Sequence, residues 1–180
     1  MPRTPITAPV VLFGSILFGG SAAGAVAQEP AGVFAEFGGV ALRGQAPHYA
    51  EFGAGVFDLA DEDSAAGRIE LRGGNKAWFL GPAIGLLANT DGGVFGYGGV
   101  YADIAYGSFV LTPLFAVGGY ARGDGPELGG VFQFRSSIGV SYEFPGKARL
   151  GLSVAHISNA GIHDENPGAE EIYLFYSLPF

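Results

Sequence analysis

Residues 131–144 read VFQFRSSIGVSYEF and alternate between apolar and polar or small side chains more cleanly than the rest of the chain. Neighbouring side chains on a β-strand point to opposite faces, so this stretch predicts a strand with one apolar and one polar face. Aromatic residues at both ends of the apolar face are typical of a strand that crosses a membrane as part of a β-barrel. The apolar parity, which Ser136 alone interrupts, comprises Phe132, Phe134, Ile138, Val140, Tyr142 and Phe144.

Seven more stretches have a comparable pattern, so the sequence predicts an all-β chain whose eight antiparallel strands close into a transmembrane barrel of the outer-membrane type. The last strand ends on the terminal Phe180, as does the sorting signal of outer-membrane barrels. An ordinary edge strand would leave this apolar face at a sheet margin. Residues 31–42 alternate weakly and are a ninth strand or a segment lying against the barrel. The seven other predicted strands are 49–59, 67–73, 78–89, 94–106, 109–120, 147–158 and 172–180.

Composition narrows the functional classes. The chain has 180 residues, no Cys, and 9 Lys and Arg against 17 Asp and Glu. The absence of Cys excludes a thiolate nucleophile, and the acidic balance argues against nucleic acid as a partner. An eight-stranded barrel has room for side chains but not for an open channel, which argues against a porin. The charged residues expected to fill its lumen are Arg68, Glu70, Arg72, Arg135 and Glu143.

Residues 1–27 have the features of a secretory signal peptide. Arg3 gives the positive start, Val10–Phe18 the apolar middle, and Ala25–Ala27 a small-x-small cleavage site. The apolar run is short and Gly-rich for a membrane anchor. We therefore expect residues 28–180 to be the barrel domain, exported to the outer membrane.

Three polar residues that suit nucleophilic catalysis flank the predicted loop between the last two strands. His156 and Ser158 lie at the outer end of one strand, and Glu170 begins the next. Their parities place all three on the lipid-facing side, whereas Glu171 has the opposite parity. Antiparallel neighbours lie about 5 Å apart, so the three side chains can meet.

The expected roles follow from acyl-transfer chemistry. A serine hydroxyl needs a base, so His156 would take the proton of Ser158 while Glu170 fixes the tautomer of the imidazole. The tetrahedral intermediate needs hydrogen-bond donors, and the nearby candidates are the backbone amides of residues 159–161 and the Asn166 side chain. Metal binding by His163, Asp164 and Glu165 is a weaker interpretation than a solvated loop.

The motifs HISNAG (His156–Gly161) and NPGAE (Asn166–Glu170) resemble the signature of the outer-membrane lipid A 3-O-deacylases (PagL-type), an acyloxyacyl hydrolase family. The resemblance is strong over about residues 150–180. It implies an eight-stranded barrel that removes the ester-linked acyl chain at the 3-position of lipid A, without a metal or other cofactor. His156, Ser158 and Glu170 match the family's triad, Asn166 its loop Asn, and Ser158–Gly161 its Ser-Asn-Ala-Gly turn, which includes Asn159.

Two other hypotheses stay open at this point. The first is a non-enzymatic structural barrel with an idle triad, and the second is a phospholipase on the same scaffold. Under the leading hypothesis the partners are lipopolysaccharide as substrate and the outer membrane, and a homodimer is left open.

Overall fold

The computed structural model describes residues 32–61 and 63–180, and the regular structure in these ranges is β-strand throughout. The predicted signal peptide lies outside the described residues. No helix in the described part of the chain is long and apolar enough to span a bilayer.

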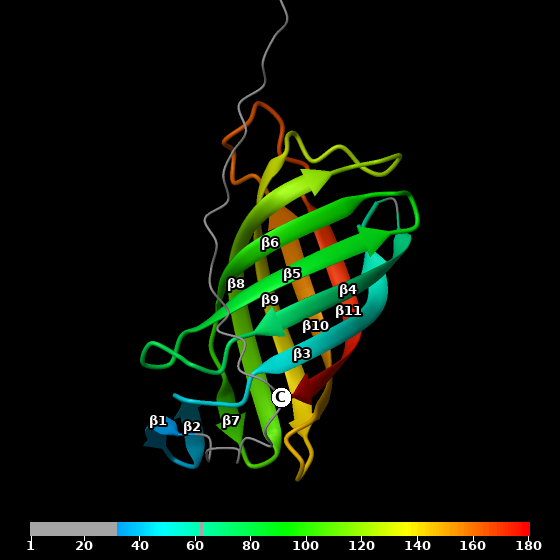
Figure 1. Ribbon diagram of the computed structural model, residues 1–180. Helices are drawn as coiled ribbons and strands as arrows, with labels where there is room; N and C mark the ends of the chain where they lie inside the picture. The colour runs from blue at the N-terminus through cyan, green and yellow to red at the C-terminus, as the bar shows by residue number, and fades with distance from the viewer. Residues whose placement is uncertain (1–31, 62) are drawn as a thin grey trace, which may run out of the picture.

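Eight long strands form a closed antiparallel barrel, which confirms the predicted fold class (Figure 1). Each strand pairs with its neighbours in the chain, and β11 pairs with β3 to close the wall. Every predicted strand has a counterpart. The strands are β3 (Tyr49–Phe57), β4 (Ser64–Arg72), β5 (Gly81–Asn89), β6 (Val94–Tyr101), β8 (Phe109–Ala121), β9 (Phe132–Glu143), β10 (Arg149–Ser158) and β11 (Ala169–Pro179).

Several boundaries differ from the prediction. β4 begins at Ser64 rather than at 67 and β11 at Ala169 rather than at 172, and two further differences have a visible structural cause. The stretch 94–106 is divided into β6 and the short β7 (Ile104–Tyr106), although both pair with β8. The division falls at Asp103, whose buried carboxylate bonds Lys76 and Arg149. The stretch 78–89 becomes a strand only at Gly81, because a tight turn with reciprocal backbone bonds between Ala77 and Leu80 precedes it.

The described residues of the range 31–42 contribute no barrel strand, and residues 33–42 lie in a hairpin of β1 (Val33–Phe37) and β2 (Val40–Arg43). This hairpin pairs through β2 with β7 and so extends the sheet from β8. The hairpin lies outside the closed wall, so the barrel has eight strands and the hairpin does not supply a ninth.

The two faces of the wall have opposite character. In β4, buried and exposed residues alternate along the whole strand, with Arg68, Glu70 and Arg72 buried and Ile69 and Leu71 exposed. The inward charges are paired, so the expected lumen network is confirmed and leaves an apolar outside for lipid. Its ion pairs include Arg68–Glu51 at 2.6 Å, Arg72–Glu70 at 2.6 Å, Arg135–Glu171 at 2.8 Å, Arg149–Asp103 at 2.9 Å and Arg149–Glu143 at 3.1 Å.

The barrel has two unlike ends. The long connections 122–131 and 159–168 lie together at one end, which we call the loop end (Figure 1). The C-terminus, β1, β2 and β7 lie towards the opposite end, which we call the terminal end. The candidate catalytic residues are therefore at the loop end.

Candidate active site

His156 and Glu170 form a pair on the outside of the barrel. They are direct cross-strand partners in the β10–β11 ladder. His156 Nδ1 lies 3.1 Å from Glu170 Oε1, and the two side chains are 52% and 50% exposed. The carboxylate is thus placed to accept a proton bonded to Nδ1, which leaves Nε2 available for a second partner.

Glu171, the neighbouring carboxylate, has a different environment. It is buried in the lumen, where Arg135 donates to it from Nε at 2.9 Å and lies 2.8 Å away through Nη2. The parity assignment that favoured Glu170 over Glu171 therefore agrees with the structure.

Ser158 lies two residues beyond His156 on the same outward face and is half-buried. Its partner in the β9–β10 ladder is Phe134, which stacks with Phe115 and meets Phe132 edge-on. Within the described residues, no hydrogen bond joins Ser158 to His156. In unliganded enzymes the bond between nucleophile and base is often long and tightens when substrate binds.

The buried Asn159 organises the loop that follows Ser158. Its Nδ2 group donates to Leu128 O at 3.0 Å and to Glu165 O at 2.7 Å, and its Oδ1 accepts from Gly161 N–H at 2.9 Å. These bonds connect both arms of the 159–168 loop to each other and to the 122–131 loop. Asn159 therefore supports the loop with all of its side-chain polar atoms.

The loop bonds also restrict which groups can face an oxyanion. The N–H of Asn159 donates to Asn166 Oδ1 at 2.9 Å, and the N–H of Gly161 is taken by Asn159. Among the predicted donors in the described chain, the Ala160 N–H and Asn166 Nδ2 have no hydrogen bond. Because Asn166 turns its Oδ1 towards the backbone, its amide group is oriented with Nδ2 pointing the other way.

Gly168 belongs to the NPGAE motif but was not among the predicted site residues. Its φ is +76°, and a Cβ atom there would lie 2.9 Å from His156 Cε1 and 3.4 Å from Nε2. The backbone at this glycine therefore packs against the imidazole edge that carries Nε2. The sequence signal that could have indicated this contact is the glycine between Asn166 and Glu170 in the motif.

Ser136 is the second feature whose position was missed. It is exposed on the outward face and is the cross-strand partner of His156 on β9, opposite to Glu170. Sequence reasoning noted it as the one polar interruption of an apolar face. Ser136 is paired with β10 on one side and with β8 on the other. It therefore has no loop amides beside it that could donate to an oxyanion, unlike Ser158.

Three charged or titratable loop residues lie apart from the His156–Glu170 pair. His163, Asp164 and Glu165 line a hollow with Glu127 between the two long loops. In the described chain, no group of three or more His, Asp and Glu side chains has an arrangement suited to a metal ion.

Residues 59–179 match the model of the family described as lipid A 3-O-deacylase (PagL). The chain belongs to this lipid A 3-O-deacylase family. Over 53 residues it is 40% identical to a lipid A deacylase PagL of Bordetella bronchiseptica, and over 52 residues it is 36% identical to one of Pseudomonas aeruginosa. Each alignment spans 29% of this chain and 30% of the relative's length.

The barrel of this family member is also similar to a solved structure. A crystal structure of the outer membrane enzyme PagL superposes with a TM-score of 0.62 at 21% identity, covering 73% of this chain and 99% of that one. At this identity the likeness concerns the fold, and it agrees with the closed eight-stranded barrel.

Proposed function

We propose that this chain is an outer-membrane serine esterase that removes the ester-linked acyl chain at the 3-position of lipid A. The observation that carries the proposal is the His156–Glu170 pair at 3.1 Å on the outer surface of the barrel, with Ser158 on the same face. Its membership of the lipid A 3-O-deacylase family supports the substrate class.

In the proposed reaction, Ser158 Oγ attacks the ester carbonyl carbon while His156 Nε2 accepts the hydroxyl proton. Glu170 holds the Nδ1–H and stabilises the imidazolium. The Ala160 N–H and Asn166 Nδ2 donate to the oxyanion. On collapse, the imidazolium gives its proton to the departing sugar hydroxyl, and the acyl group stays on Ser158.

A water molecule completes the cycle. His156 takes one proton of the water, whose oxygen attacks the acyl carbon, and then returns a proton to Ser158 Oγ as the fatty acid leaves. The products are one fatty acid and a lipid A with one acyl chain fewer. These groups account for every proton in the sequence, so the mechanism invokes no metal or cofactor.

The surroundings suit a substrate that lies in a lipid leaflet. Below the pair, the outward face of β9 and β10 is apolar, with Ile138, Leu152 and Val154 more than half exposed. Above it are the polar long loops. A lipid anchored in the outer leaflet would place its acyl chains on the wall and its sugar headgroup at the loops, so its ester bonds would lie near Ser158.

This geometry requires the loop end to face the cell exterior and the terminal end to face the periplasm. We accordingly propose the outer membrane as the location, with export directed by residues 1–27. The apolar outer wall provides the membrane contact that this placement needs.

The test compares two serines that flank the same imidazole. Mass spectrometry of lipid A measures the outcome. We expect lipid A from cells that express the native chain to have lost one acyl chain, and we expect Ser158→Ala to abolish this loss. Ser136→Ala is the matched control and should retain activity, because Ser136 lacks nearby loop amides. Unchanged lipid A with the native chain would contradict the proposal, and loss of activity in Ser136→Ala alone would move the nucleophile to Ser136.

A second experiment with phospholipid distinguishes the phospholipase hypothesis from lipid A deacylation. Purified protein is given lipid A and phosphatidylethanolamine in the same micelles, and released fatty acids are assigned to each substrate. We expect release from lipid A. Release from the phospholipid alone would make the chain a phospholipase on this scaffold.

A further inference from the structure

The β1–β2 hairpin is a part of the chain that the proposed reaction does not use. It lies at the terminal end, far along the barrel from the long loops (Figure 1). It also lies outside residues 59–179, the range that matches the family. The pairings β1–β2, β2–β7 and β7–β8 connect it to the barrel wall as a continuous sheet.

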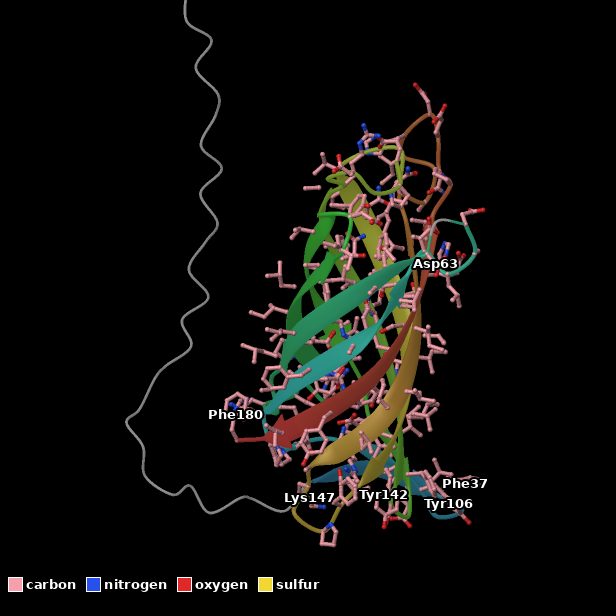
Figure 2. All side chains as sticks on the ribbon, turned by 90° about the vertical axis from the view of Figure 1, so that its right-hand side faces the viewer. Phe37, Asp63, Tyr106, Tyr142, Lys147 and Phe180 are labelled. Carbon is pink, nitrogen blue, oxygen red and sulfur yellow. The ribbon has the colours of Figure 1, made fainter. Side chains whose placement is uncertain are left out.

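A row of apolar side chains runs from the hairpin onto the barrel. Phe37 is opposite Val40, which is opposite Tyr106. Tyr106 is opposite Phe109, and Phe109 is opposite Tyr142 of β9. Figure 2 shows Phe37, Tyr106 and Tyr142 close together at one end of the molecule. We call this row, Phe37–Val40–Tyr106–Phe109–Tyr142, the hairpin row.

The same register carries the row around the barrel. Directly paired residues share one face of a sheet, so the partners that follow Tyr142 lie on the same side as Phe37. They are Leu150, Tyr176, Phe52, Ile69 and Leu86, all exposed on the outer wall. The hairpin row is therefore an extension of the lipid-facing surface.

The row is too apolar to face water without a partner. Phe37 is 90% exposed, Tyr106 64% and Phe109 59%. The opposite face of the hairpin differs, because Arg43 is buried there and bonds Glu143. A contiguous exposed apolar patch of this kind marks an interaction surface.

Local contacts fix both ends of the hairpin row. The hairpin turns at Gly38 and Gly39, whose φ angles are +58° and +81°. A Cβ at Gly39 would lie 3.3 Å from the ring of Tyr106, so this glycine allows close approach of the aromatic ring. At the other end of the row, the rings of Phe109 and Tyr142 meet edge-on at 5.8 Å.

We propose that the hairpin row is immersed in bilayer lipid at the periplasmic interface, so that β1 and β2 widen the membrane contact of the barrel on one side. Lipid is the occupant because the row continues, in register, a surface that the barrel presents to lipid. Aromatic residues favour this interfacial depth. The proposal rests on the proposed membrane location, but not on the esterase activity.

The test uses tryptophan as a depth reporter. Trp78 is the only tryptophan of the chain, so Trp78→Phe gives a silent background. Into it we place Phe37→Trp, with Ile138→Trp in the middle of the β9 outer face as the lipid reference and Asp124→Trp in the 122–131 loop as the water reference. Each variant is reconstituted in phosphatidylcholine vesicles that contain nitroxide-labelled lipid, and iodide is the aqueous quencher.

We expect nitroxide lipid to quench Phe37→Trp within about twofold of Ile138→Trp, and more strongly when the label lies near the headgroup than at the chain end. Iodide should quench Asp124→Trp much more strongly than Phe37→Trp. If iodide quenches Phe37→Trp like Asp124→Trp while Ile138→Trp responds to lipid, the hairpin proposal is wrong and the barrel remains in the membrane. If Ile138→Trp also fails to respond to lipid, both the location and the hairpin proposal are wrong.

Discussion

Replacing Gly168 by alanine tests whether the loop backbone fixes the position of the proposed base. The new Cβ would lie 2.9 Å from His156 Cε1 and 3.1 Å from Ile157 O. Nonbonded carbon atoms prefer about 3.5–4.0 Å, so the imidazole has to move by roughly 0.6–1 Å. The movement would disturb the 3.1 Å contact between His156 and Glu170 and the approach of Nε2 to Ser158.

The size of the effect follows from this displacement. A misplacement of about 1 Å in a catalytic group can lower a rate by about a hundredfold, or about 2.7 kcal/mol of activation free energy. Alanine at a positive φ also costs about 1–2 kcal/mol of stability, independently of the imidazole. We expect kcat for lipid A deacylation to fall between about tenfold and a hundredfold.

Gly92→Ala separates these two effects. Gly92 has the same φ of +76°, but a Cβ there would meet its nearest atom, Gly123 Cα, only at 4.0 Å. Both variants should lose similar stability in urea unfolding from detergent micelles, whereas only Gly168→Ala should lose kcat in a micellar lipid A assay. If Gly168→Ala deacylates within about twofold of Gly92→Ala, backbone packing at Gly168 does not position the base.

Three further substitutions address the neighbours of the site. Glu170→Gln should lower the deacylation rate by up to about ten-thousandfold without changing urea stability, because it removes the carboxylate from an exposed pair; a native rate would exclude Glu170 from the reaction. Glu171→Gln should instead destabilise the barrel by about 3 kcal/mol, because it leaves Arg135 with an unpaired buried charge; unchanged unfolding would contradict that. Asn159→Ala removes three side-chain hydrogen bonds worth about 1 kcal/mol each, so the 122–131 and 159–168 loops should become protease-sensitive. Native protease resistance would refute this role.

Strand parity was enough to predict which side of the wall His156, Ser158 and Glu170 occupy. The period of two in β9, β10 and β11 separates His156 and Glu170 from Arg135 and Glu171, because one face packs a polar lumen and the other is apolar. The same reasoning predicted the eight barrel strands. It rests on local alternation, which a single sequence displays directly.

The features that parity missed depend on contacts between distant segments. The division at Asp103 reflects bonds to Lys76 and Arg149, 27 and 46 residues away in sequence. Ser136 could be recognised as a polar interruption, but its position opposite His156 depends on the β9–β10 register. The contact of Gly168 with the imidazole likewise depends on how the loop returns to β11.

The consecutive carboxylates of β11 connect stability to the proposed chemistry. The β10–β11 register sets Glu170 opposite His156 and Glu171 opposite Ala155. A slip of one residue would turn Glu170 into the lumen and Glu171 onto the lipid-facing side. In the slip that sets Glu170 opposite Ala155, Glu170 would take the place of Glu171 beside Arg135, whereas His156 would face Ala169 and lose its carboxylate. The Arg135 ion pair alone therefore does not oppose this slip. Ser177 does, because its hydroxyl donates to the buried Glu51 at 2.7 Å and a slip would turn it towards lipid, so a lumen contact farther along β11 favours the register that the proposed esterase needs.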